Sequence, residues 1–142
     1  MQLYDSLIDL LADARGRDRE IRFIDGEHDE SSLSFDELWD RASALLGALQ
    51  ARGMRQGDEL VIFSKSNESF VVAFWAAVLG GIVPVPVAVG ISDEHKLKLF
   101  RILSQLENPT LFTEMDQLQR LHDFAQSEGM ADIEKLLDTH AV

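Results

Sequence analysis

The stretch from Asp58 to Val89 constrains the fold most, because it reads as a strand, an almost uncharged helix and a second strand. Residues 59–64 form a short apolar run that fits a buried strand. Residues 70–79 are nearly all apolar, so the helix that they form should be buried on most sides. Two strands joined through one helix of this length are expected to run parallel. The sequence therefore predicts a right-handed βαβ unit at the centre of the fold.

Local signals mark the limits of this central helix and of the strand after it. Asn67, or Ser66 before it, can cap the helix N-terminus by accepting a backbone hydrogen bond. The glycine pair at 80–81 is expected to end the helix, because glycine adopts the left-handed conformation found at helix C-termini. Pro84 and Pro86 cannot donate ladder hydrogen bonds. The second strand is therefore predicted at an edge of the sheet, or leaving it.

The pattern of residues 33–38 predicts the start of a second helix. Ser34 is placed to cap the helix and Glu37, three residues later, completes a capping box. Leu33 and Leu38 can pack together as a hydrophobic staple across the cap. The apolar positions continue at helical spacing until Gly53, where we expect this helix to end.

The remaining segments complete an α/β pattern, in which helices and strands alternate from residue 33 onward. A short strand at 22–24 runs into a turn, and either a hairpin returning through 27–32 or a flexible tip is compatible with the polar residues there. We predict an α/β fold with a mostly parallel sheet and helices on both faces. As a single domain or domain fragment, it would comprise an N-terminal helix at 3–14, an α/β core at 20–113 and a C-terminal helical segment at 114–140.

Composition excludes several classes of function. The chain has 142 residues, which suffices for one domain with a real core. Its formal net charge of −12 gives no electrostatic footprint for nucleic acid, so no nucleic-acid partner is expected. The absence of cysteine excludes disulfides, thiolate catalysis and cysteine metal sites.

Neither a secretory signal nor a membrane span is expected, and we predict a cytoplasmic protein. The N-terminus lacks a basic region and mixes acids with its apolar residues. Residues 70–91 are long and apolar enough to resemble a span. The glycine pair and the Pro-x-Pro sequence inside this stretch instead favour two separate elements of a soluble fold.

No constellation of catalytic or metal-binding residues stands out. The four histidines lie in different predicted elements without ligand spacing, and surface positions explain them: His28, His95, His122 and His140. The acidic pairs 36–37 and 93–94 occupy predicted helix starts, where the helix dipole favours acids, and the pair 29–30 does not indicate a site. Trp39 and Trp75 sit among apolar neighbours and are expected to be core residues.

One loop is placed where an anion can bind. Residues 64–66, Ser-Lys-Ser, follow a predicted strand and precede a helix N-terminus. Polar residues in such a loop also need no ligand to explain them. The glycine pair at 80–81 lacks the further glycines, lysine and hydroxyl residue of a phosphate-binding loop.

Two segments resemble the first two core motifs of the adenylate-forming superfamily, which includes acyl-CoA synthetases, fatty acyl-AMP ligases and adenylation domains of nonribosomal peptide synthetases. The family pattern Leu-Thr/Ser-Tyr-x-Glu-Leu is matched with Phe in place of Tyr, and the pattern of a helix end followed by Gly-x-x-x-Val-Pro is matched at the end of the central helix. The segment between them resembles the family pattern G-x-x-x-G-D-x-V. The matched residues are Leu33, Ser34, Phe35, Glu37, Leu38, Leu79, Gly80, Gly81, Val83 and Pro84.

The resemblance covers roughly residues 20–113, and Pro84-Val85-Pro86 with residues 93–97 looks closest to the fatty acyl-AMP ligase branch. It implies the first subdomain of the ligase N-terminal domain, where both motifs are structural. The family's phosphate loop, magnesium-binding residues, ribose aspartate and catalytic lysine have no matching positions here. We therefore assign no catalytic, cofactor-binding or metal residue to this chain, and expect ATP and Mg²⁺ only in a full-length parent.

Three hypotheses follow from these observations. The leading one is an N-terminal fragment, inactive alone, of a ligase that joins a carboxylate to AMP and passes the acyl group to a carrier-protein thiol or CoA. The second is a stand-alone interaction module that complements a separate partner, and the third is a small α/β enzyme with a site at 64–67. A part of a larger sheet should also expose apolar surface, so homo-oligomers are expected.

Overall fold

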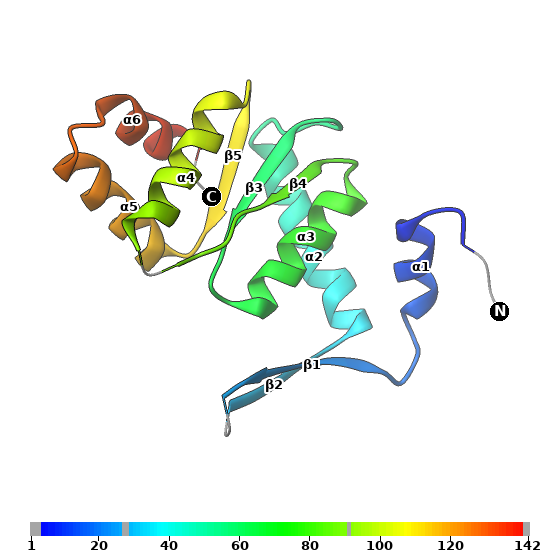
Figure 1. The fold of residues 1–142 in the computed structure, drawn as a ribbon. Helices are drawn as coiled ribbons and strands as arrows, with labels where there is room; N and C mark the ends of the chain where they lie inside the picture. Colours follow the sequence, from blue (N-terminus) through cyan, green and yellow to red (C-terminus); the bar gives the residue numbers. More distant parts are fainter. Residues whose placement is uncertain (1–3, 27–28, 91, 141–142) are drawn as a thin grey trace. The chain divides into compact units, whose positions relative to one another are not determined.

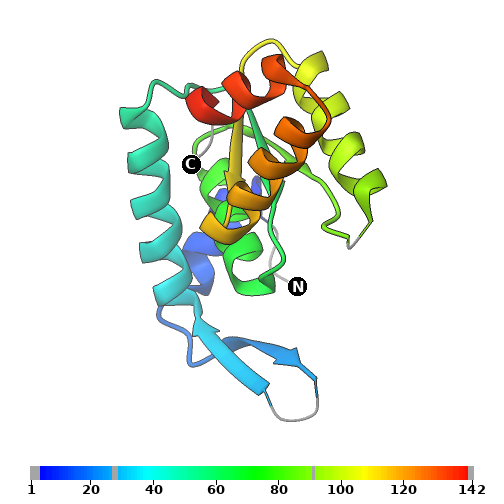
Figure 2. The ribbon, with the colours of Figure 1, turned by 90° about the vertical axis from the view of Figure 1, so that its left-hand side faces the viewer.

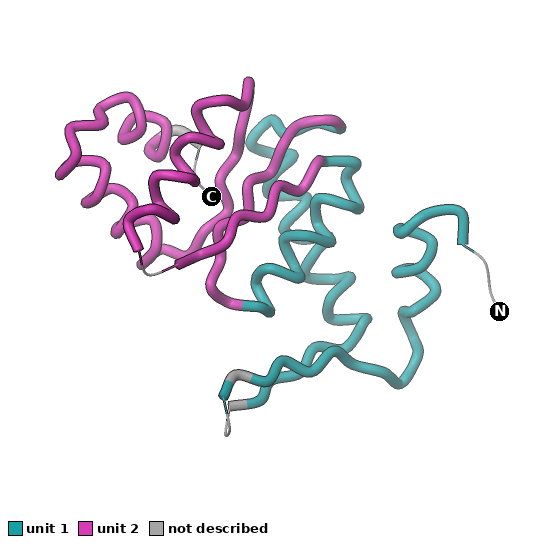
Figure 3. The backbone as a smooth tube through the Cα atoms, viewed as in Figure 1, with its two compact units in different colours: residues 1–56, 67–82 teal, residues 57–66, 83–142 magenta. Residues whose placement is uncertain are grey.

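The computed structural model describes residues 4–26, 29–90 and 92–140, and its helices and strands alternate from residue 35 to residue 127 (Figure 1). The elements run in the order α1 (Leu7–Ala14), β1 (Glu20–Asp25), β2 (Asp29–Ser34), α2 (Phe35–Ala51), β3 (Glu59–Phe63), α3 (Asn67–Leu79), β4 (Val83–Pro86), α4 (Asp93–Gln105), β5 (Pro109–Thr113), α5 (Met115–Ser127) and α6 (Ala131–His140). They form two compact units, one of residues 1–56 and 67–82 and the other of residues 57–66 and 83–142 (Figure 3). The expected division at residues 20 and 113 stays a prediction.

The first unit contains a hairpin followed directly by a helix. Strands β1 and β2 pair antiparallel, with Ile21 opposite Leu33, and β2 continues into α2 (Figure 2). The hairpin alternative of the sequence is therefore confirmed, while residues 27–28 of its turn lie outside the described residues. Helix α2 begins after Ser34, whose Oγ accepts a hydrogen bond from the backbone N–H of Glu37 at 3.1 Å. The predicted helix start is confirmed.

The N-terminal helix is shorter than the predicted span of 3–14. Helix α1 begins at Leu7, because Ser6 has an extended backbone and its Oγ accepts a hydrogen bond from the N–H of Asp9 at 3.2 Å. Leu3, which contributed to the predicted pattern, lies outside the described residues. Apolar spacing alone placed the start too early, since a local cap decides where the helix begins.

Helix α3 has the burial that its composition predicted. No residue from 70 to 79 is classed as exposed, and Ala73, Ala76 and Ala77 are completely buried. The helix ends as expected at the glycine pair, where Gly81 adopts a φ of +64° and the N–H of Ile82 donates to Ala77 O at 2.9 Å. Such a bond, closed by a left-handed glycine, is the usual way for a helix to satisfy its last carbonyls.

The buried cluster of the first unit joins its helices to the hairpin. Its fully or nearly buried members are Leu11, Leu33, Leu38 and Val72. Partly buried side chains pack against them, including both tryptophans. Leu33 and Leu38, the expected staple across the α2 cap, thus lie in one apolar cluster.

The second unit is built on a parallel three-stranded sheet of order β4-β3-β5. Val61 at the centre of β3 lies opposite Val85 on one side and Leu111 on the other. Helices α4, α5 and α6 supply the remaining core, together with β3 and β5. Strand β5 extends the predicted strand at 110–113 by one residue. The α/β class with a mostly parallel sheet is confirmed.

The prolines of β4 are compatible with the sheet because of where their nitrogens face. The N–H group of Val83 donates to the carbonyl of Asp58, just before β3, at 2.8 Å, and that of Val87 donates to Ile62 in β3 at 3.0 Å. Successive residues of a strand direct their backbone groups to opposite sides, so the nitrogens of Pro84 and Pro86 face away from β3. The missing donors therefore fall on the outer side of an edge strand, as the sequence predicted.

In the described part of the chain, no helix is both long and apolar enough to cross a membrane.

Candidate functional site

The carboxyl ends of β3 and β5 meet where the strand order reverses. The chain passes from β3 to β4 on one side and then to β5 on the other side of β3. In open parallel sheets, ligands bind at such a switch point, outside the carboxyl ends of the strands. Ser64 directly follows β3 and Glu114 directly follows β5. This end of the second unit is therefore the candidate site.

The donors of the 64–66 loop bind a carboxylate of the chain itself. Ser64 Oγ donates to Glu114 Oε1 at 2.5 Å, and the N–H of Ser66 donates to the same oxygen at 3.2 Å. These two residues are 48 and 50 positions away from Glu114 in sequence. Of the two readings that the sequence left open for this loop, the structure thus shows its donors bound to a side chain of the chain itself, that of Glu114.

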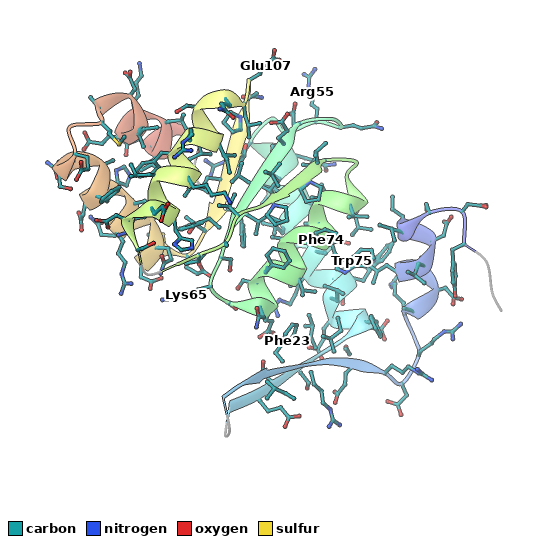
Figure 4. The ribbon with its side chains drawn as sticks, viewed as in Figure 1. Phe23, Arg55, Lys65, Phe74, Trp75 and Glu107 are labelled. Carbon is teal, nitrogen blue, oxygen red and sulfur yellow. The ribbon has the colours of Figure 1, made fainter. Side chains whose placement is uncertain are left out.

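Lys65 in the same loop also faces an acid that follows β5. Its Nζ lies 2.6 Å from Asp116 Oδ2, and the residue sits on the turn between β3 and α3 (Figure 4). The hydrogen bond from Lys65 holds the pKa of Asp116 below its ordinary value of 3.8. Both side chains are about half exposed, so this pair contributes little to stability.

A pocket of about 300 Å³ opens beside this loop. It is lined by Lys65, Val89, Gly90, Lys96, Gln117 and Arg120, and we call it the cationic pocket. Its lining residues come from the loops after β3 and β4 and from helices α4 and α5. Among the described residues, its polar side chains are two lysines, an arginine and an amide, without a carboxylate. Such a donor set suits an anion.

Two polar atoms at this end of the sheet are buried without a partner among the described residues. They are Thr113 Oγ1 and Glu114 Oε2. Gln117 is 6% exposed and lines the cationic pocket. Buried polar groups are normally hydrogen-bonded, so this end of the sheet has unused bonding capacity.

The motif residues hold secondary structure together. In the first motif Leu33 and Leu38 are buried, Ser34 caps α2, and Glu37 supplies the N–H that the cap binds. Phe35, the first residue of α2, is partly buried against the cluster of the first unit. These contacts agree with a structural role, which stays a prediction.

The second motif ends α3 and begins β4. Leu79 is the last residue of α3, and Gly80 and Gly81 follow it. A Cβ on Gly80 would meet the end of the Leu46 side chain on α2, so glycine leaves room for that side chain there. Val83 is 48% exposed and Pro84 is half-buried, both in the edge strand.

The residues that sequence reasoning set aside occupy structural positions. Trp39 packs partly buried, with the Arg15 guanidinium 4.6 Å from its ring centroid. His95 Nδ1 lies 2.8 Å from Ser92 Oγ, and His122 Nε2 lies 3.2 Å from Asp138. His28 and the side chain of His140 fall outside what the structure describes.

The sequence analysis missed the partners that α5 supplies. Glu114, Asp116, Gln117 and Arg120 all lie in or just before the first two turns of α5. Their position in the sequence could have indicated them, because polar residues directly after a predicted parallel strand lie at the edge of the sheet where ligands bind. The acids were not recognised as partners of the 64–66 loop because nothing local connects them to it.

Comparison with known proteins identifies the family. The family model described as AMP-binding enzyme matches residues 11–141. The chain is 24% identical over 134 residues to the long-chain-fatty-acid–AMP ligase FadD32 of Mycobacterium marinum, covering 92% of this chain and 21% of that protein. It is 41% identical over 73 residues to a 4-hydroxybenzoate–CoA/benzoate–CoA ligase of Rhodopseudomonas palustris, covering 51% of this chain and 13% of that protein.

Solved structures agree with this assignment. The adenylation domain of a keto acid-selecting nonribosomal peptide synthetase module, bound to a keto acyl adenylate, is 27% identical with a TM-score of 0.81. The match covers 96% of this chain and 27% of that one. A fatty acid AMP ligase from Legionella pneumophila shares the fold, with 21% identity and a TM-score of 0.73 over 81% of this chain and 20% of that one.

The chain belongs to the AMP-binding, adenylate-forming enzyme family. Its fold matches the first subdomain of the adenylation domains, and it spans between an eighth and about a quarter of the length of the relatives named here.

The family uses ATP and Mg²⁺, and the described residues do not fit a metal ion. Nowhere in 4–26, 29–90 and 92–140 do three or more histidines or carboxylates gather as metal ligands. The cationic pocket, with three positive side chains, would repel Mg²⁺. We therefore route no chemical step through a metal or nucleotide in this chain.

Proposed function

We propose that these residues form the N-terminal structural part of an ATP-dependent acyl-adenylating ligase. The parent enzyme activates a carboxylate, a fatty acid in our reading, as acyl-AMP and transfers the acyl group to a carrier-protein thiol or to CoA. Its partners are the remainder of the ligase or synthetase and an acyl carrier protein, and it acts in the cytoplasm. ATP and Mg²⁺ bind to the parts of the parent that this chain does not contain.

The observation that carries the proposal is the extent of the family match. The family model matches residues 11–141 of this chain. The Mycobacterium marinum ligase and the keto acid-selecting adenylation domain align with more than nine-tenths of this chain, but the aligned part is only 21% and 27% of their own lengths. The shared part contains the two motifs that resemble the family's structural motifs, and no position in it resembles the family's catalytic motifs. The 142 residues on their own are therefore proposed to be inactive.

The role proposed for the chain is scaffolding. The two motifs fix the start of α2 and the junction of α3 with β4, and no catalytic group is needed for either task. In the parent, the subdomain completes the sheet and forms part of the wall of the acyl pocket. The exposed apolar residues of α1, Leu7, Ile8 and Leu10, are 52%, 38% and 40% exposed and offer surface for the rest of the enzyme or for a second copy.

Exchange of pyrophosphate into ATP tests both halves of the proposal. The native polypeptide, captured from its source cells with an antibody against this segment, should show carboxylate-dependent exchange with a panel of fatty acids. The purified 142-residue chain should show no exchange above a heat-killed control. Exchange by the isolated chain would contradict its scaffolding role, and a native polypeptide without carboxylate-dependent exchange would contradict the assignment of the parent.

A further inference from the structure

The cationic pocket is a second feature of the switch point, separate from the contacts between Glu114 and the 64–66 loop. It lies wholly within the second unit, and its lining comes from four different segments of that unit. The chain as a whole carries a net charge of −12, yet the described residues that line this pocket include three cationic side chains and no acid. Positive charge is therefore concentrated at this pocket, although the protein as a whole is acidic.

The three cations differ in how far the chain itself neutralises them. Lys65 is fully paired with Asp116 at 2.6 Å. Lys96 keeps only 22% of its side chain exposed, over the ring of Phe124, and its Nζ lies 3.6 Å from Asp93, a loose ion pair. Arg120 makes no ion pair or hydrogen bond through its side chain to the described residues. Two of the three positive charges are thus incompletely matched.

Gln117 adds a neutral donor that is built into the pocket. The residue is only 6% exposed, and it lines the pocket. The N–H groups of its amide are therefore available to donate hydrogen bonds to a ligand or to water in the pocket. Gln117 stands one helical turn before Arg120 on α5, and residues three apart face the same side of a helix.

We propose that the cationic pocket binds the phosphate group of a small molecule. Arg120 and Lys96 supply the charge, and the amide of Gln117 donates a hydrogen bond from the pocket wall. A phosphate monoester carries up to two negative charges and several acceptor oxygens, which matches a site with cationic side chains and an amide NH₂ donor. The volume of about 300 Å³ stands at the small end of ligand pockets, which suits a phosphate with a short organic group.

The proposal is independent of the acyl-adenylating function. It concerns binding by residues of this chain alone, so it is testable whether or not the parent is a ligase. Free phosphate and a phosphate ester share the recognition chemistry, and the experiment separates them.

Titration of the isotope-labelled 142-residue chain by NMR tests the site. The probes are inorganic phosphate and glycerol 3-phosphate, each raised to about 20 mM at constant ionic strength, a range that detects millimolar binding. We expect saturable shifts of the Gln117 side-chain NH₂ and of the Arg120 Nε–H. Tighter binding of the ester would identify a phosphorylated organic ligand, and tighter binding of the free ion would identify phosphate itself. Absence of saturable shifts with both probes would overturn the proposal.

A matched pair of variants separates a built site from general electrostatics. Arg120→Gln should weaken binding about tenfold, as expected when a charged hydrogen bond is lost. Arg101→Gln makes the same change of charge on α4, at a residue that lines a different, apolar pocket, and should change affinity by less than about twofold. Equal weakening by both variants would show nonspecific attraction only and refute the site. Gln117→Leu removes the amide without changing charge, and unchanged affinity in this variant would also count against it.

Discussion

Substitution of Gly81 by alanine is the sharpest test of the way in which α3 ends. Gly81 has a φ of +64°, and its neighbour Ile82 donates the hydrogen bond that closes the helix. An alanine in this left-handed conformation costs about 1–2 kcal/mol. The new Cβ would also lie 2.8 Å from Gln56 Cγ, but Gln56 is exposed and its flexible side chain is free to rotate away.

The net change in the free energy of unfolding combines the strain in the folded state with an opposing effect on the unfolded chain. Alanine restricts the unfolded chain more than glycine does, which returns roughly 0.4–1 kcal/mol of stability. We therefore expect Gly81→Ala to lower the free energy of unfolding by about 1 kcal/mol. Asparagine tolerates the left-handed region better than alanine, so Gly81→Asn should lose less.

Gly47 provides a matched control for the same chemical change. It lies inside α2, its φ is not positive, and a Cβ there would meet no atom within 4 Å. Gly47→Ala should therefore raise the free energy of unfolding by about 0.5–1 kcal/mol, because alanine favours the helix interior. Urea unfolding followed by circular dichroism measures both variants. If the two substitutions change stability in the same direction, the assigned backbone conformation at residue 81 is wrong.

Four further outcomes are expected. Ser34→Ala removes the α2 cap and should cost about 0.5–2 kcal/mol in urea unfolding, whereas a loss below a few tenths would refute the cap. Lys65→Met should raise the pKa of Asp116, measured by carboxyl NMR, back towards 3.8. Because the pKa of Asp116 is lower in the folded state than in the unfolded state, the ion pair stabilises the fold at pH values above the unfolded pKa. This contribution is lost as the pH falls through the folded pKa. Glu114→Gln should speed backbone amide exchange at Ser66, and unchanged exchange would exclude Glu114 as its acceptor. Self-association should appear in light scattering and weaken in Leu7→Ser, while a strict monomer at high concentration would contradict it.

The sequence predicted those parts of the fold that depend on neighbouring residues. The Ser34 cap, the glycine end of α3 and the edge position of β4 are each determined by a few adjacent side chains or by proline and glycine backbone chemistry. The family motifs were recognisable for the same reason, since they coincide with these local signals.

The candidate site was only half predictable from the sequence. The sequence placed the 64–66 loop after β3, where an anion can bind, and left open whether it binds one; the acid that it does bind comes from 48–50 residues further along the chain. Periodicity carries no information about such pairings, which arise only when β3 and β5 lie side by side. Gln117 was indistinguishable from an ordinary surface residue, because its burial results from the packing of α5.

The measurement that tests the central claim most directly is the size of the native polypeptide in its source cells, detected with an antibody against this segment. The segment itself has a mass of 15.9 kDa, and the matched stretch is 21% of the Mycobacterium marinum ligase. Our account predicts a product several times larger than 15.9 kDa. A product of 15.9 kDa would contradict it and would favour a subdomain that acts alone through a binding partner.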